Sequence, residues 1–244
     1  MQLSEKALAI SPSLTLKITA MAKDMKARGL DVVGFGAGEP DFDKPQHIKD
    51  AAVEAIRIGM TKYTPASGTL ELKKAVCANL KKNHDLSYGP DQIVISNGAK
   101  HSLFNAFQAI VNPGDEVLII SPYWLTYPEL VKMAGGIPVF VEAKESNNFE
   151  PLAEDIEAAV TERTKAIIVN NPSNPCGCMY SQKTLENIAE IAKRHDFFIV
   201  SDEIYGELVY DGKKHLSIAN LSDDAYTRTI LVNGLSKTYA MTGW

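Results

Sequence analysis

Residues 166–202, AIIVNNPSNPCGCMYSQKTLENIAEIAKRHDFFIVSD, decide the fold. Two short apolar runs, Ala166–Val169 and Phe197–Val200, flank a stretch from Ser181 to His195 that has the periodicity of an amphipathic helix. Ser181 is a suitable N-cap for that helix, because its hydroxyl can accept from a free amide of the first turn. Strands that are apolar on both faces and are joined through a helix indicate a parallel sheet covered on both sides.

The same alternation of strands and helices extends from about residue 91 to the end of the chain. Six strands are predicted, at residues 92–96, 117–120, 137–141, 166–169, 197–200 and 229–232. Further helices are predicted at about 99–111, 127–133 and 152–160. The sequence therefore predicts an α/β fold, a three-layer and mainly parallel sheet with helices on both faces.

The first ninety residues have a different pattern. Helices are predicted from Ser13 to Gly29, at about 46–58 and at about 69–83. The loops at 34–43 and 63–68 are rich in glycine and proline. Closely spaced glycines let the backbone approach a ligand or a partner chain.

Composition excludes several classes of protein. The 244 residues are 45% hydrophobic and 23% charged, which excludes a disordered or fibrous chain. Lys and Arg number 25 against 30 Asp and Glu, and no basic run occurs, so nucleic acid and membrane are not expected as partners. Three cysteines without framework spacing, and no leader or membrane-length stretch, favour a cytoplasmic protein. The histidines and cysteines lack metal-ligand spacing, so no metal site is expected.

Ligands of an open α/β sheet bind beyond the carboxyl ends of its strands, so the residues that follow each strand carry most of the functional information. They include a lysine, Lys237, and an acid, Asp202, which are the two groups that a pyridoxal phosphate enzyme requires. The lysine forms the Schiff base, and the carboxylate keeps the pyridine nitrogen protonated. Asn174 and Tyr205 are suitable partners for the ring oxygen, and the Trp124 indole can lie against the ring face.

The phosphate group has a candidate site at the start of the helix predicted at 99–111. Gly98, Ala99 and Lys100 open that helix, where free backbone amides favour an anion, and the Ser236 hydroxyl can assist them.

Each of these residues alone has a simpler explanation. A lysine after a strand is usually solvated, and an aspartate there is usually a cap or turn residue. The glycines at 34, 36 and 38 could indicate a dinucleotide site and an NAD-dependent oxidoreductase, but they lead into Glu39-Pro40-Asp41 instead of a helix.

Six ordered motifs together identify a family. They are GAGEPDFD (36–43), KYTPASG (62–68), SPYWLTYP (121–128), NPSNPCG (171–177), SDEIY (201–205) and SKTYAMTGW (236–244). In these motifs the chain resembles the class I aminotransferases of the pyridoxal phosphate fold-type I superfamily, in particular the aspartate/aromatic branch. The chain differs from the family pattern at Lys44 and at Cys176, positions without a chemical role.

The resemblance implies a role for each site residue. Lys237 would form the aldimine and then move the proton, Asp202 would pair with the pyridine nitrogen, and Tyr205 and Asn174 would bind the ring oxygen. Asn174, Trp124 and the Gly38 backbone would also face the substrate. Gly98, Ala99, Lys100 and Ser236 would hold the phosphate. Tyr63 would reach the phosphate of the partner subunit, so a homodimer is expected.

The resemblance also implies a division of the chain. Residues 1–45 would belong to the small domain and the dimer contacts, and residues 46–244 to an incomplete pyridoxal phosphate-binding large domain. The chain stops at Trp244, before the family's phosphate-binding arginine, its next sheet strand, which is antiparallel, and its C-terminal small domain, so the sequence is expected to be truncated.

The expected function is an aminotransferase of amino acid metabolism, which moves an amino group between an amino acid of aspartate or aromatic type and a 2-oxo acid. Two alternatives remain open. Another fold-type I enzyme, such as a C–S lyase or a decarboxylase, shares the same early chemistry. An inactive fragment would bind without turnover, and the lack of an interior strand would leave unpaired backbone and exposed apolar surface.

Overall fold

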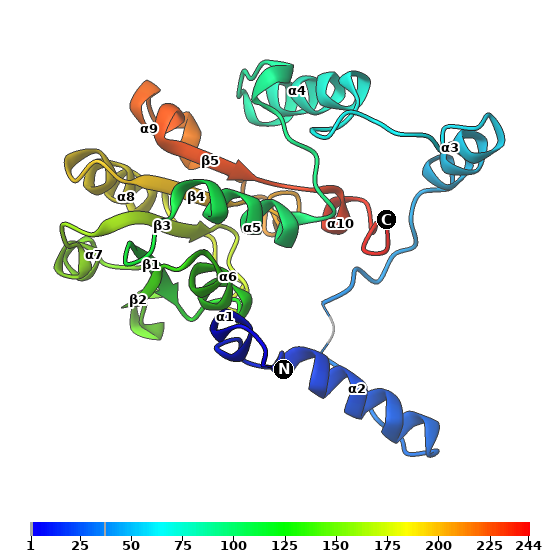
Figure 1. The fold of residues 1–244 in the computed structure, drawn as a ribbon, viewed down its shortest axis with the longest axis horizontal. Helices are drawn as coiled ribbons and strands as arrows, with labels where there is room; N and C mark the ends of the chain where they lie inside the picture. The colour runs from blue at the N-terminus through cyan, green and yellow to red at the C-terminus, as the bar shows by residue number, and fades with distance from the viewer. Residues whose placement is uncertain (1, 37) are drawn as a thin grey trace.

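The computed structural model of the chain describes residues 2–36 and 38–244. Its centre is a sheet of five strands, β1 (Glu116–Ser121), β2 (Ile137–Glu142), β3 (Thr164–Asn170), β4 (Phe198–Asp202) and β5 (Thr229–Val232). The order across the sheet is β2-β1-β3-β4-β5, and all four neighbouring pairs are parallel. The α/β fold with a parallel sheet is therefore confirmed (Figure 1).

Helices cover both faces of this sheet and are joined to it by short loops (Figure 1). The helices of the described residues, of which only some pack on the sheet, are in chain order α1 (Glu5–Leu8), α2 (Leu14–Ala27), α3 (Gln46–Arg57), α4 (Leu70–His84), α5 (Ala99–Ile110), α6 (Thr126–Ala134), α7 (Ala153–Ala159), α8 (Gln182–Arg194), α9 (Asp223–Arg228) and α10 (Leu235–Thr238). Single 3-10 turns lie at η1 (Pro90–Gln92), η2 (Glu145–Asn147) and η3 (Ile218–Asn220).

Two hydrophobic cores lie on opposite faces of the sheet, because successive side chains of a strand point to opposite sides. In β1, Leu118 and Ile120 pack with residues of α7 and α8, whereas Val117 and Ile119 pack with residues of α5 and α6. Both sets are almost fully buried. The continuous apolar runs of the sequence are therefore explained by burial on both faces, and the three-layer arrangement is confirmed.

The predicted Ser181 cap is also confirmed. Its hydroxyl accepts from the Thr184 amide at 3.2 Å and starts α8. Burial of one face of α8, with Leu185 and Ile188 fully covered, then holds the helix against the sheet.

Helices α2 and α3 extend away from the sheet (Figure 1). Ser13 caps α2 through the Leu16 amide, as the sequence predicts, but no residue of α2 or of α3 is buried. The apolar face of α2, with Ile18 and Met21, is exposed in the described part of the chain.

The strand predicted at residues 92–96 is wrong. The segment is extended, but the Ile95 amide donates to the Ser67 carbonyl at 3.0 Å and not to a strand, and the Val94 side chain is exposed. Among the described residues, edge strand β5 pairs only with β4. An extended segment becomes a strand only through a pairing partner, and residues 92–96 have none among the described residues.

The glycine-rich loops have different environments. A Cβ at Gly68 would lie 2.4 Å from Ile95 Cγ1, so this glycine allows a close approach within the chain itself. The loop that contains Gly38 and Glu39 lies beside the C-terminal residues, where the Thr242 hydroxyl donates to Glu39 at 2.7 Å. None of the helices in the described part of the chain has both the length and the apolar character needed to cross a membrane.

Candidate active site

The carboxyl ends of β3, β4 and β5 bring the predicted site residues to one edge of the sheet. Asn170 ends β3 and is paired in register with Asp202, which ends β4, and Asp202 is paired with Val232 at the end of β5. The short helix α10, which carries Lys237, follows β5 directly.

Asp202 is a buried carboxylate with two donors. The Tyr127 hydroxyl donates to its Oδ2 at 2.7 Å, and the Ile204 amide donates to its Oδ1 at 3.2 Å. Burial raises the pKa of Asp202 to about 6, although both hydrogen bonds act in the opposite direction. The described residues supply no cation to this carboxylate, so it is suited to a ligand group that carries a proton or a positive charge.

Asn174 and Tyr205 are in direct contact at this edge. The Asn174 Nδ2 donates to the Tyr205 hydroxyl at 3.2 Å. The Asn170 side chain links them to the strand, since its Oδ1 accepts from the Asn174 amide at 2.7 Å and its Nδ2 donates to the Asp202 carbonyl at 2.9 Å. Burial and the nearby Asp202 charge raise the pKa of Tyr205.

Lys237 joins this group from α10. Its Nζ lies 5.9 Å from the centre of the Tyr205 ring and donates to the Gly38 carbonyl. Partial burial lowers the pKa of Lys237, and the Glu39 carboxylate acts against this. A lowered pKa favours the neutral amine, which is the nucleophilic form.

Trp124 is connected to Asp202 through Tyr127. Its ring meets Tyr127 edge-on, with the ring centres 5.4 Å apart, and Tyr127 in turn contacts Asp202. The Lys100 Nζ lies 5.1 Å from the centre of the Trp124 indole. Trp124 is therefore placed beside the carboxylate through Tyr127.

The predicted phosphate-binding residues lie at the first turn of α5 and in α10. Gly98 has φ 82° and ψ 165°, a conformation that glycine adopts readily, and it turns the chain into α5 at Ala99. The first amides of a helix have no partner within the helix, so Ala99 and Lys100 present donors there. A Cβ at Gly98 would meet nothing within 4 Å, so there is open space beside this residue. Ser236 is half-buried in α10.

Tyr63 is not part of this cluster. Its side chain is fully exposed in the loop between α3 and α4, where it lines a surface hollow with Thr61, Lys62 and Thr64. Gly38, by contrast, is joined to the cluster through Lys237.

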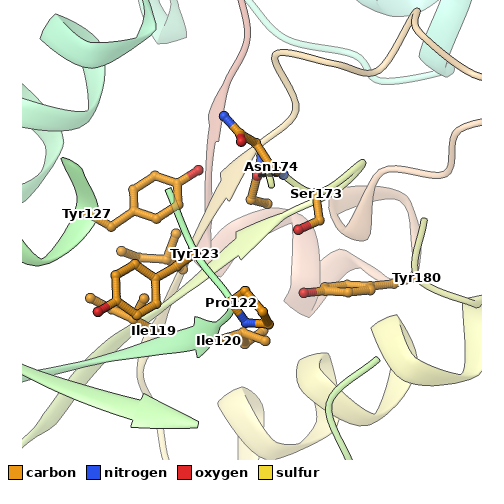
Figure 2. Close-up of a pocket in the computed structure, with 10 residues that line it drawn as sticks. Ile119, Ile120, Pro122, Tyr123, Tyr127, Ser173, Asn174 and Tyr180 are labelled. Carbon is orange, nitrogen blue, oxygen red and sulfur yellow. Dashed lines mark hydrogen bonds between the residues drawn. The ribbon is translucent and has the colours of Figure 1, made fainter. Parts of the chain in front are cut away.

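A small cavity lies directly behind the cluster, at the ends of β1 and β3. Figure 2 shows the Tyr127 hydroxyl pointing toward Asn174 above this cavity, with Tyr123 and Pro122 on one side and Tyr180 on the other. The rest of the lining consists of Ile119, Ile120, Ile168, Asn170 and Ser173. Its walls combine apolar side chains with the polar groups of Asn170, Ser173 and Asn174, so the cavity adjoins the polar cluster.

The donor set fits pyridoxal phosphate. A buried carboxylate without a cation suits a protonated ring nitrogen, the amide and hydroxyl of Asn174 and Tyr205 suit a ring oxygen, and Lys237 supplies an amine. The first turn of α5 suits a phosphate.

Sequence reasoning missed two residues that the structure places in the cluster. Tyr127 was predicted only as a helix residue, although it lies in the motif SPYWLTYP, which was the available signal. Asn170 was predicted only as the first residue after the strand at 166–169, without a role of its own, and its position at that carboxyl end was the signal.

In a comparison with known proteins, residues 30–244 match the family model described as aminotransferase class I and II. The chain is 52% identical over 244 residues to an aspartate aminotransferase of Bacillus subtilis, covering 100% of this chain and 62% of that protein. It is 49% identical over 235 residues to a probable aspartate/prephenate aminotransferase of Aquifex aeolicus, covering 96% of this chain and 60% of that protein.

A solved structure gives the same result. The aspartate aminotransferase of Thermus thermophilus with maleate superimposes with a TM-score of 0.96 at 45% identity, over 100% of this chain and 63% of that chain. The chain thus spans about 62% of the length of the curated relatives that it matches.

Proposed function

Because the chain belongs to the family of class I and II aminotransferases, we propose that it carries the pyridoxal phosphate site of an enzyme that moves an amino group between an amino acid and a 2-oxo acid. One observation carries this proposal. Asp202, Asn174, Tyr205 and Lys237 come from three separate stretches of the sequence and form one connected cluster at the edge of the sheet.

When bound, pyridoxal phosphate supplies an electron sink for the substrate's Cα carbanion. Lys237 would bind the cofactor covalently and, once released, would take the proton from the substrate Cα. Asp202 would hold the proton on the ring nitrogen, which its buried and uncompensated carboxylate favours. Asn174 and Tyr205 would bind the ring oxygen.

The remaining residues would hold and orient the cofactor. The Trp124 indole would lie against the ring, and Gly98, Ala99, Lys100 and Ser236 would bind the phosphate through the first turn of α5. The Gly38 backbone, with Trp124 and Asn174, would face the substrate. The contact between the Gly38 carbonyl and Lys237 supports the placement of Gly38 at the reacting end.

We also propose aspartate as an amino donor, because the relatives described above are named for aspartate or for aspartate and prephenate. The proposal includes a cytoplasmic homodimer in which Tyr63 reaches the cofactor phosphate of the partner subunit. The full exposure of Tyr63 supports this part, since its side chain is free to meet another chain. Residues 1–45, with the exposed face of α2, would form part of the small domain and the dimer contacts, and residues 46–244 would form the large domain.

The experiment is a titration of the chain with pyridoxal phosphate, followed by borohydride reduction and mass mapping. We expect a visible absorbance band and a label on Lys237, and we expect Lys237→Ala to lose both. Lys213→Ala is the matched control, because Lys213 is an exposed lysine outside the cluster. A colourless chain, or a Lys237→Ala variant that keeps the band, would contradict the proposal.

The type of reaction is tested separately on an active form of the enzyme. Glutamate produced from 2-oxoglutarate with aspartate as donor supports amino transfer. Release of ammonia and a thiol from a cysteine conjugate, without glutamate, would identify a C–S lyase instead.

A further inference from the structure

Glu203 is a buried carboxylate that the proposed function does not use. It follows Asp202 directly, and because successive residues of an extended chain point to opposite sides, its side chain points away from the cofactor cluster. Only 2% of that side chain is exposed. A buried carboxylate is costly unless donors or a cation satisfy it, so its surroundings need an explanation.

Three side chains donate to this carboxylate. The Ser201 hydroxyl lies 2.8 Å from Oε1, the Ser217 hydroxyl lies 2.7 Å from Oε1, and the His215 Nε2 lies 2.8 Å from Oε2. We call these four residues the Glu203 cluster. Ser201 belongs to β4, whereas His215 and Ser217 lie more than ten residues further along the chain, so the cluster joins the two ends of segment 204–217.

The environment of His215 indicates which of its two ring nitrogens carries the proton. Its Nδ1 is buried and has no partner among the described residues, so a proton there would be unsatisfied. Nε2 therefore carries the proton and donates to Glu203. The His84 ring packs against His215 edge-on with the ring centres 5.8 Å apart, and the His84 Nε2 lies 3.4 Å from Glu207 Oε1.

The absence of a side chain at Gly206 allows the His215 ring to pack closely against the turn formed by residues 203–206. A Cβ at Gly206 would lie 3.2 Å from His215 Cδ2 and 3.2 Å from the Glu203 carbonyl oxygen. A side chain at this position would press against both partners of the pair.

Segment 204–217 carries Tyr205 at its first turn. The Gly206 amide donates to the Glu203 carbonyl at 2.9 Å, and the Leu208 amide donates to the Tyr205 carbonyl at 2.8 Å. Beyond this turn the segment is exposed from Tyr210 to Lys214. The placement of Tyr205 therefore depends on how firmly the segment is closed onto β4.

We propose that Glu203 and His215 are positioning residues for Tyr205. Their buried hydrogen bond closes segment 204–217 onto strand β4 and thereby fixes the Tyr205 hydroxyl against Asn174. The role in cofactor binding rests on the function proposed above, whereas the closure of the segment does not.

The closure is tested by hydrogen exchange on the chain without cofactor. Glu203→Gln and His215→Phe are expected to speed exchange of the Gly206 and Leu208 amides about tenfold or more, because a lost hydrogen bond to a charged group favours local opening. His215→Gln keeps a donor and is expected to restore slow exchange. Glu157→Gln is the matched control, since it breaks the exposed pair of Glu157 with His195 at 2.6 Å and should leave these amides unchanged.

The positioning role is tested by a double-mutant cycle on pyridoxal phosphate affinity. If Glu203 acts through Tyr205, Glu203→Gln weakens binding in the native background and has little further effect in Tyr205→Phe. Circular dichroism confirms that each variant is folded, and His215→Phe, which removes the donor to Glu203, takes the place of Glu203→Gln if that variant does not fold.

The outcomes separate the two proposals. Unchanged exchange in both Glu203→Gln and His215→Phe overturns the closure, whether or not cofactor binds. Fast exchange with additive effects on affinity overturns the role in placing Tyr205. A native chain that binds no cofactor contradicts the proposed function and, with it, the cofactor role of Glu203, while exchange still decides the closure.

Discussion

The Tyr127 hydroxyl donates a 2.7 Å hydrogen bond to Asp202 Oδ2, across the space between helix α6 and the end of strand β4. Both groups are buried, with 2% of each residue exposed. The bond stabilises the ionised form of Asp202 and so lowers its pKa, against the larger effect of burial. Tyr127 therefore lowers the pKa of the carboxylate that we propose to face the cofactor ring nitrogen.

Tyr127→Phe is expected to raise the pKa of Asp202 further. A hydrogen bond to a charged group contributes about 1.5 kcal/mol or more, which corresponds to about one pKa unit. The measurement is a pH titration of carboxyl-labelled aspartate by carbon NMR on the chain without cofactor. Tyr180→Phe is the control, because Tyr180 is also buried but makes no hydrogen bond with Asp202. An Asp202 titration identical in Tyr127→Phe and the native chain would contradict the prediction.

Asp202→Asn is expected to stabilise the chain without cofactor at neutral pH. Burial raises the pKa of Asp202 from 3.8 to about 6, so the folded chain binds this proton more tightly than the unfolded chain does. The resulting stability is complete below about pH 4 and is lost as the pH rises to about 6, by up to about 3 kcal/mol. Asparagine carries no such charge, so the variant lacks this loss.

Urea unfolding of both proteins between pH 4 and pH 7 checks this prediction through the difference between their free energies of unfolding. That difference should grow in favour of Asp202→Asn as the pH rises. The same variant should bind pyridoxal phosphate at least about a hundredfold more weakly, since it leaves a buried positive charge unpaired. A constant stability difference over this pH range would show that Asp202 has an ordinary pKa.

The fold was predictable because its signals are local. The apolar runs of β3 and β4, the periodicity of α8 and the Ser181 cap each lie within a few residues, and the structure places the helix at Gln182–Arg194. The parallel arrangement then brings strand ends to one edge, which is why residues as distant as Asn174 and Lys237 could be assigned to one site.

The errors concern features that depend on distant partners. Residues 92–96 have a strand-like composition but no strand to pair with among the described residues, so the composition alone was misleading. The contact of Tyr127 with Asp202 joins residues 75 positions apart and depends on how α6 packs on the sheet. No local pattern encodes such a contact, and the hydrogen bonds of Glu203 were missed for the same reason.

Gly98→Ala is expected to reduce both stability and cofactor affinity. Gly98 has φ 82° and ψ 165°, which an alanine adopts only at a cost of about 1–3 kcal/mol. Gly114→Ala is the control, because Gly114 also has a positive φ of 90° and open space around a Cβ, but lies at the opposite end of the sheet. Thermal unfolding should show a loss in both variants, whereas cofactor titration should show weaker binding only in Gly98→Ala. Equal affinities in the two variants would argue against a phosphate site at α5.

Asn170→Ala is expected to break the link between Asp202 and Asn174. Its side chain joins the Asp202 carbonyl to the Asn174 amide, at 2.9 Å and 2.7 Å, so the substitution leaves a buried and a part-buried backbone group with fewer partners. We expect a loss of about 2–3 kcal/mol in the free energy of unfolding, from about 1 kcal/mol or more for each hydrogen bond.

The neighbouring Asn171 offers a matched control for that variant. Its side chain accepts from the Tyr180 amide at 2.9 Å, away from Asn174, so Asn171→Ala should lose stability without displacing the cluster. Cofactor affinity should therefore fall more in Asn170→Ala than in Asn171→Ala, and urea unfolding reports whether the stability losses are comparable. If both variants keep native affinity, the position of Asn174 does not depend on Asn170, and the contact of Asn174 with Tyr205 alone must hold it in place.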